Sequence, residues 1–125
     1  MNRLTLQQVL MMHETIIAQT GGSQGVRDIG LLSAALAAPF VTFSGQELYP
    51  TVEEKASRLG YGLIKNHAMI DGNKRLAFHC MLMFLLINQI RLSYTLKEAE
   101  KLVLDVASDK ASLEDLYDWI QQHKK

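Results

Sequence analysis

Leu76-Ala77-Phe78-His79-Cys80-Met81-Leu82-Met83-Phe84-Leu85-Leu86-Ile87-Asn88-Gln89 is the most apolar stretch of the chain. It contains no Asp, Glu, Lys or Arg, and its longest uninterrupted apolar run, Cys80 to Ile87, covers eight residues. A helix that spans a membrane needs about 18 or more such residues. The stretch therefore predicts a helix that begins near Asn73 and is buried on nearly all sides within a folded domain.

Several helix starts can be recognised around this central helix. Four times a Thr or Ser is followed three residues later by Gln, Glu or Asp, and apolar residues then recur with the 3.6-residue period of an amphipathic helix. In such a capping box the two side chains satisfy backbone N–H groups that the start of a helix leaves unpaired. The pairs are Thr5 and Gln8, Thr51 and Glu54, Thr95 and Glu98, and Ser112 and Asp115.

The remaining segments predict one short helix and several connections. Asp28 to Ala38 favours a helix that ends at Pro39. Glycine and proline mark loops at Thr20 to Gly25 and at Phe40 to Pro50. No stretch alternates like a strand for long, although Val41 to Phe43 and Arg91 to Tyr94 could hold short extended pieces. We predict an all-α protein: a single domain over residues 1–125, with about six helices around the central apolar helix.

Composition narrows the kinds of partner. Lys plus Arg equals Asp plus Glu, at 13 each, so no overall field draws the chain toward nucleic acid or a membrane. Any anion site must be local. The single cysteine, Cys80, cannot form an internal disulfide, and Met1 to Thr5 lacks the apolar segment of a signal peptide. We expect a cytoplasmic protein with neither nucleic acid nor membrane as a direct partner.

The segment His67 to Arg75, which reads His-Ala-Met-Ile-Asp-Gly-Asn-Lys-Arg, immediately precedes the apolar helix. Its Asp71-Gly72-Asn73 is a cluster of turn formers, so Lys74 and Arg75 fall in the first helical turn. Cations at a helix N-terminus are unfavourable by roughly 0.3–1 kcal/mol each. A bound anion would reverse that sign, because free N–H groups, the helix dipole and both side chains would then point at a phosphate.

Two further residues of this segment suit phosphoryl chemistry. Asp71 lies beside the predicted anion cradle, and one carboxylate together with substrate phosphates is the usual way to hold Mg²⁺. His67 can take a hydroxyl proton at neutral pH. Cradle, metal carboxylate and base are the components of phosphoryl-type transfer. Taken singly, each has a plainer explanation: a partly buried histidine, a turn that caps the next helix, and two cations that extend to solvent.

His67 to Arg75 resembles the signature of the Fic/Doc family, which has the general form His-Pro-Phe-x-Asp/Glu-Gly-Asn-Gly/Lys-Arg. Lys74 stands where Fic proteins usually carry Gly and where the Doc (death-on-curing) toxin branch carries Lys. The likeness continues in Gly21-Gly22, in Gly25 to Pro39 and in the Tyr61 to His67 lead-in. It covers roughly residues 5 to 95.

The resemblance implies the toxin half of a toxin–antitoxin pair. Such a toxin is a kinase that moves the γ-phosphoryl group of ATP, with Mg²⁺, to a hydroxyl of a translation factor, elongation factor Tu in the known cases. His67 would be the base, Asp71 would hold Mg²⁺, and the anion cradle would comprise Gly72, Asn73, Lys74 and Arg75. The resemblance also implies a small antitoxin whose flexible tail folds against the toxin.

The family's Pro, Phe and Thr are replaced here by Ala68, Met69 and Leu76. Two alternatives stay open. One is a Fic-type enzyme that transfers a nucleotidyl (AMP) group, for which Lys74 is the wrong residue. The other is a Fic/Doc-like binding module without catalysis, which only the three replacements favour.

The other histidines are expected to be structural. His79, one turn after Arg75, could face the site, but the pattern favours a hydrogen-bonded core histidine. His13 and His123 have no partner at the spacing of metal ligands, so we expect no zinc site.

Overall fold

A computed structural model describes residues 1–125 of the protein and shows the predicted all-α architecture. The α-helices are α1 (Leu6–Thr20), α2 (Ile29–Ala37), α3 (Val52–Asn66), α4 (Asn73–Ile87), α5 (Leu96–Ala107) and α6 (Leu113–His123). A 3₁₀ turn, η1 (Ala38–Phe40), leads into a small hairpin of β1 (Thr42–Phe43) and β2 (Gln46–Glu47). None of the helices combines the length and the apolar character that crossing a membrane requires.

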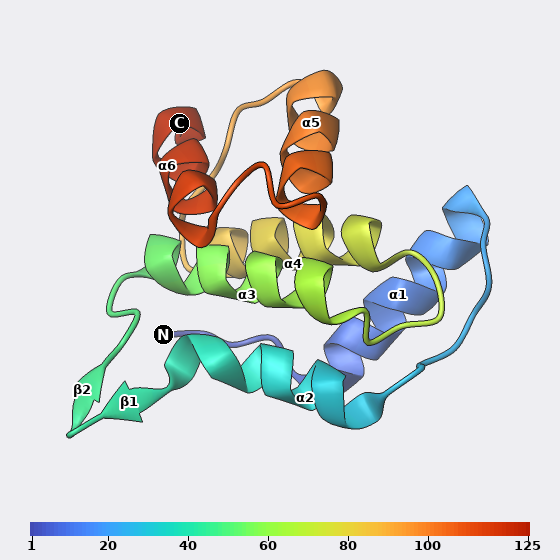
Figure 1. The fold of residues 1–125 in the computed structure, drawn as a ribbon, viewed down its shortest axis with the longest axis horizontal. Helices are drawn as coiled ribbons and strands as arrows, with labels where there is room; N and C mark the ends of the chain where they lie inside the picture. The colour runs from blue at the N-terminus through green and yellow to red at the C-terminus, as the bar shows by residue number, and fades with distance from the viewer.

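The helices form three layers around α3 and α4 (Figure 1). α3 and α4 lie side by side in the middle, α5 and α6 cover them above, α2 lies below, and α1 rises at the right from the level of α2 to that of α4. Gly60 allows the two central helices to approach closely, because a Cβ there would lie 3.1 Å from the Met81 sulfur. The buried core draws on every layer, from Val9 and Leu32 to Leu116.

The central helix α4 is less enclosed than its composition predicts. One stripe, including Leu76, Cys80 and Phe84, is fully buried. The opposite stripe is open, with His79 and Leu86 exposed. The prediction that His79 is a hydrogen-bonded core histidine is wrong: its ring makes no hydrogen bond. The reason is its position four residues after Arg75, which places it on the side of α4 that the neighbouring helices leave uncovered.

All four predicted capping boxes are present, each with both of its hydrogen bonds. Asp28 caps α2 through a bond from the Leu31 N–H. Both short extended pieces are present too, since Thr42–Phe43 forms β1 and Leu92 pairs with Lys124. Buried Lys55 fixes the hairpin to α3 by donating to Glu47 Oε1 at 2.8 Å and to the Tyr49 carbonyl.

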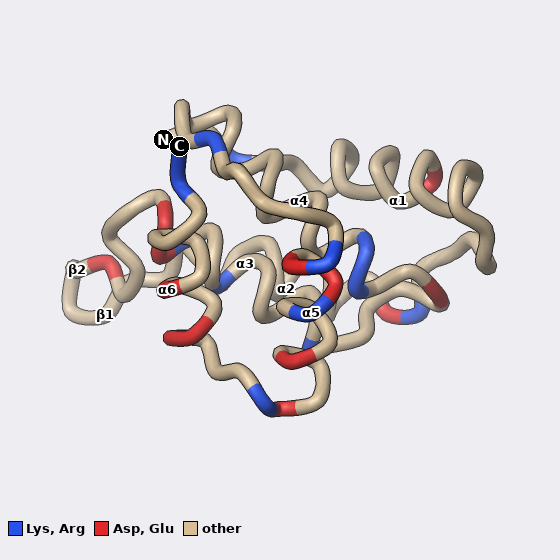
Figure 2. The backbone as a smooth tube through the Cα atoms, turned by 90° about the horizontal axis from the view of Figure 1, so that it is seen from above, with Lys and Arg blue, Asp and Glu red and all other residues tan.

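Charges of both signs are interspersed along the backbone rather than gathered by sign (Figure 2). The long helix α1 carries a single one, Glu14, and α2 carries none. Any local anion site must therefore be sought where a few cations meet unpaired backbone N–H groups.

Cys80 is enclosed, and burial raises the pKa of its thiol to about 12, so this thiol is inert at neutral pH.

His123, at the end of α6, links α6 to the start of α5. Its two ring N–H groups face Glu98 Oε2 at 2.9 Å and the Trp119 carbonyl at 2.7 Å, and its ring stacks on Trp119. Both partners are acceptors, so the doubly protonated ring fits best. Burial lowers the pKa of His123, but the bonds to Glu98 and Trp119 outweigh it and the net pKa is raised. The His123 hydrogen bond lowers the pKa of Glu98 to about 2.

This pair predicts a pH window for stability. The contribution of Glu98 is complete above its ordinary pKa of 4.5 and is lost as the pH falls toward 2. The contribution of His123 is complete below its ordinary pKa of 6.5 and is lost as the pH rises through its raised folded pKa. In urea unfolding, the free energy of unfolding of the natural chain should exceed that of Glu98→Gln by the largest amount between pH 4.5 and pH 6.5. Gln can still complete a capping box, as Gln8 does in α1. A difference that does not change with pH would contradict the pairing.

Candidate active site

The turn after α3 presents His67. This residue is the C-cap of α3, with φ 49° and ψ 50° in the left-handed region that non-glycine residues rarely adopt. Its side chain is exposed. Arg27, from the loop between α1 and α2, donates from Nε to the His67 carbonyl at 2.7 Å and from Nη2 to the Asn66 carbonyl at 3.0 Å. The side chain of His67, the proposed base, is therefore exposed to solvent at the C-terminal end of α3.

The residues after His67 are held by backbone pairing with the loop that follows α1. Val26 and Met69 form an antiparallel bridge. The N–H groups of Arg27 and Asp28 both donate to the Ala68 carbonyl, at 2.8 and 3.0 Å, and the Ile70 N–H donates to the Gly25 carbonyl at 3.1 Å. Ala68 and Met69 are buried beneath this pairing. The motif loop is therefore a short strand-like segment rather than a free loop.

Asn73 closes the loop from the other side. Its Oδ1 accepts from the Met69 N–H and its Nδ2 donates to the Met69 carbonyl, both at 3.0 Å. The side chain is therefore occupied by the loop backbone. What Asn73 offers to an anion is its backbone N–H.

The N-terminus of α4 is open. Its N-cap is Gly72, and α4 is the one α-helix without a side-chain cap. The first backbone bond into the helix runs from the Leu76 N–H to the Gly72 carbonyl at 2.9 Å, so the N–H groups of Asn73, Lys74 and Arg75 have no acceptor in the chain. Gly72 has φ 73°, and a Cβ there would lie 2.9 Å from Ile17 Cδ1. Glycine is thus required at the turn that leaves this helix end uncapped.

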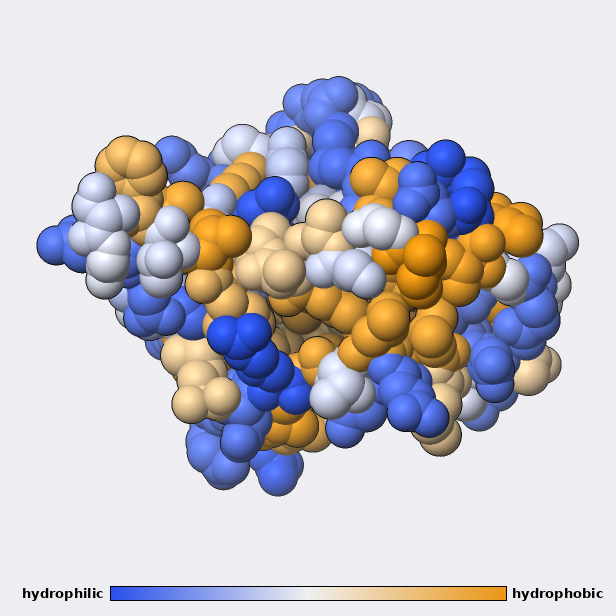
Figure 3. All heavy atoms as spheres, turned by 90° about the horizontal axis from the view of Figure 1, so that it is seen from below, coloured by the Kyte–Doolittle hydropathy of each residue, from blue (hydrophilic) through white to orange (hydrophobic).

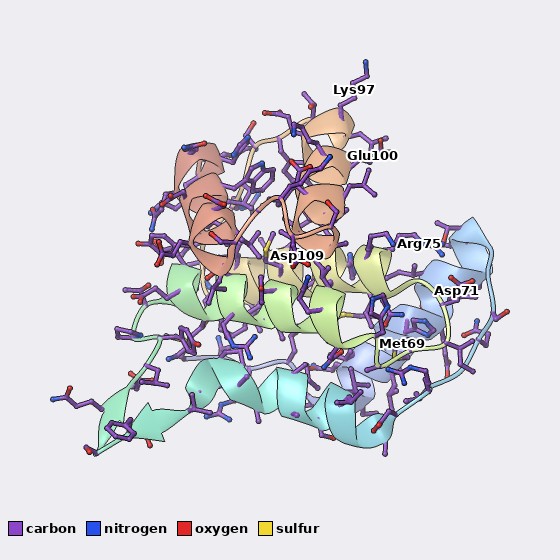
Figure 4. The ribbon with its side chains drawn as sticks, in the orientation of Figure 1. Met69, Asp71, Arg75, Lys97, Glu100 and Asp109 are labelled. Atoms are coloured by element: carbon purple, nitrogen blue, oxygen red, sulfur yellow. The ribbon has the colours of Figure 1, made fainter.

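Asp71 is fixed by backbone donors. Its Oδ2 accepts from the Ser23 N–H at 3.1 Å and its Oδ1 from the Gly72 N–H at 2.8 Å. These two bonds hold the pKa of Asp71 below its usual range, so the group is an anion at neutral pH. Figure 4 shows Asp71 and Arg75 at the same end of the helical layers, beside the motif loop.

The site offers one carboxylate to a cation. No group of three or more His, Cys, Asp or Glu side chains is placed to hold a metal ion. A single ionised carboxylate, with its side chain 46 % exposed beside an open helix N-terminus, fits Mg²⁺ that completes its shell with phosphate oxygens and water. It does not fit a cation caged by protein ligands alone.

The two cations of the motif differ in their surroundings. Arg75 Nη1 donates to Thr20 Oγ1 and, at 3.1 Å, to the Gly21 carbonyl, so Arg75 binds the end of α1. Its Nη2 lies 3.9 Å from Asp71 Oδ1. Lys74 is exposed and has no partner in the chain. Lys74 is therefore the cation that is free at the open end of α4.

Sequence reasoning missed two supporting residues. Buried His13, on α1, bonds through Nε2 to the Asp71 carbonyl at 2.7 Å, 58 residues away. Arg27 bonds the end of α3 across about 40 residues. Neither spacing carries a local signal. Arg27 lies within Gly25 to Pro39, a stretch that resembles the family, but the resemblance assigned no role to Arg27.

Comparisons with known proteins identify the family of the chain. Residues 3–85 match the Fic/DOC family. The chain therefore belongs to the Fic/Doc family, and the recognition made from the motif is confirmed. The chain is also similar to a protein named Toxin Doc from Mycolicibacterium smegmatis, with 41 % identity over 98 residues. This similarity covers 77 % of the chain and 75 % of that protein.

The packing of Asp71 against the glycine loop predicts a contrast between two neighbouring glycines. Gly22 has φ 113°, and a Cβ there would lie 2.6 Å from Asp71 Oδ2. Gly21 has φ 86° and nothing within 4 Å of such a Cβ. Each alanine substitution should cost about 1–3 kcal/mol in backbone strain. Gly22→Ala should lower the free energy of unfolding by more than Gly21→Ala, as measured in urea. Equal losses would show that Asp71 is not held against Gly22.

The two cations predict opposite outcomes for matched alanine variants. Arg75→Ala removes the bonds to Thr20 and Gly21 and should lower the melting temperature. Lys74→Ala removes no bond within the chain and an unfavourable charge at the helix start, so the melting temperature should stay the same or rise slightly. It should weaken ATP binding by about 1.5–3 kcal/mol, the usual loss for one charge-assisted bond. Calorimetry and ATP titration check both variants. ATP affinity that survives Lys74→Ala would remove Lys74 from the anion site.

Proposed function

We propose that this protein is the toxin of a toxin–antitoxin pair and transfers the γ-phosphoryl group of ATP to a hydroxyl of a translation factor, with elongation factor Tu as the expected target. One observation carries the proposal: α4 begins without a cap, with free Lys74 at that end and Asp71 beside it. Membership of the Fic/Doc family and similarity to a protein named Toxin Doc support it.

In the proposed reaction, this chain binds phosphate and takes up a proton. The oxygen of the target hydroxyl attacks the γ-phosphorus, the bond from that phosphorus to the β-phosphate oxygen breaks, and ADP leaves. His67 takes the hydroxyl proton. The N–H groups at the start of α4 and Lys74 hold the negative oxygens of the phosphates. Mg²⁺, held through Asp71, would neutralise phosphate charge when bound.

The exposure of His67 supports a macromolecular acceptor. A base buried in a closed pocket could serve only a small molecule, whereas His67 lies on the surface at the end of α3. A hydroxyl on another folded protein can reach it there.

The three departures from the family signature lie in the core. Ala68, Met69 and Leu76 are all buried, under the loop and against the central helices. They change packing, whereas His67, Asp71 and Lys74 keep the groups that a ligand would meet. This contrast favours an active enzyme over a binding module. Lys74 in place of the usual Gly favours phosphoryl over nucleotidyl transfer, as the resemblance implies.

The proposed antitoxin would find an uncharged surface on α1 and α2. These helices hold one charged residue between them, Glu14. Met11 and Ile29 are exposed. On the side where α2 lies, Figure 3 shows apolar side chains gathered over the centre and right of the face, with a hollow among them. A flexible tail with an apolar stripe would suit this face.

A labelling experiment tests the proposed reaction. Purified protein, Mg²⁺ and elongation factor Tu are incubated with ATP that carries label at the γ- or at the α-phosphate. We expect label in elongation factor Tu from the γ-position only. His67→Ala should lower the rate by about 10²–10⁴-fold and leave ATP affinity nearly unchanged, because a base acts on the hydroxyl.

Controls separate the three functions. Asp71→Asn keeps the turn but removes the charge, so Mg²⁺ should no longer strengthen ATP binding. Label from the α-position would assign nucleotidyl transfer instead. No label from either position, with ATP still bound, would assign a binding module. In cells, His67→Ala should relieve the growth arrest caused by the intact chain without its partner.

A further inference from the structure

Arg27 makes an unusual set of bonds to the end of α3. Its guanidinium donates to the carbonyls of Asn66 and His67, and its backbone N–H donates to the carbonyl of Ala68 at 2.8 Å. One residue thus binds three successive carbonyls. All three belong to the turn that carries the candidate base.

This turn lacks the usual means of ending a helix. Helices often end on a left-handed glycine whose N–H bonds back to the preceding turn. Here the left-handed residue is His67, and its N–H makes no such bond. The backbone of His67 must therefore be held in this disfavoured conformation by contacts from outside α3. The two charge-assisted bonds from Arg27 reach the carbonyls on either side of the His67 N–Cα unit.

The left-handed conformation decides where the imidazole points. It ends α3 sharply, so that Ala68 and Met69 turn into the core while the His67 side chain stays outside. A right-handed His67 would continue α3, and the change in φ from 49° to the helical value would rotate its Cβ about the N–Cα bond by roughly 110°. The direction of the base therefore depends on the backbone at residue 67.

We propose that Arg27 is a positioning residue: it holds His67 in the left-handed conformation in which its imidazole faces the target hydroxyl. The guanidinium acts on the backbone carbonyls and does not touch the reacting atoms. The catalytic part of this proposal rests on the proposed function. Its conformational part does not, and the two can be measured separately.

The conformational test uses the free protein. Backbone chemical shifts and the N–H to Hα coupling of His67 report its φ angle by NMR. We expect a left-handed His67 in the natural chain and a shift toward right-handed or extended values in Arg27→Met. Arg27→Lys keeps the charge but not the fork, and should show the same shift. Arg58→Met is the matched control, because Arg58 lies on α3 without a side-chain hydrogen bond, and it should change nothing at His67.

The kinetic test uses the transfer to elongation factor Tu. Misplacing the base should lower kcat by about 10–100-fold in Arg27→Met while KM for ATP stays within about twofold. Raised KM with unchanged kcat would overturn the proposal and make Arg27 a phosphate ligand. Unchanged φ at His67 in both Arg27 variants would overturn it as well. If the chain transfers nothing, the proposed function fails, and the NMR result still decides whether Arg27 holds His67. If Arg27→Met does not fold, Arg27→Lys decides both measurements.

Discussion

The antiparallel pairing between residues 25–28 and 68–70 is the interaction on which the rest of the site depends. Its backbone bonds tie the loop after α1 to the loop between α3 and α4, and the bonded residues are 40 to 45 positions apart in the sequence. The close packing of α3 and α4 at Gly60 fixes the ends that this loop must join. The pairing then fixes the path between them. His67 precedes the paired stretch and Asp71 follows it, so the pairing fixes the backbone between these two residues.

That constraint also explains why α4 begins open. Its capping position needs a left-handed backbone, so it is glycine and offers no side-chain acceptor. Asp71 could have served as a cap, but its carboxylate is directed to the N–H groups of Ser23 and Gly72. The first N–H groups of α4 are left for an outside anion, in a protein whose other α-helices all cap their own starts. An uncapped start in such a chain is a specific feature of α4.

The features that could be predicted from the sequence arise from residues that lie close together along the chain. Capping boxes and apolar periodicity lie within a few residues, so the helices and the glycine turn at Gly72 followed from the sequence. The motif residues were found for the same reason. Contacts across the chain could not be predicted: His13 meets the Asp71 carbonyl across 58 residues, and Arg27 meets α3 across about 40. Exposure of His79 was missed because composition alone does not say which side of a helix its neighbours cover.

The two cations of the motif differ in what they contact: Arg75 is bonded within the chain, whereas Lys74 is exposed and unpaired. Arg75 is bonded to the C-terminal turn of α1, where a cation also suits the helix dipole, so an anion that recruited it would have to replace those bonds. Lys74 has no such bond to give up. Its charge at the helix start is unfavourable in the free protein and becomes favourable once an anion arrives. Lys74, which stands where the resemblance places the lysine of the Doc branch, is thus exposed and unpaired in this fold, at the helix end where we propose that phosphate binds.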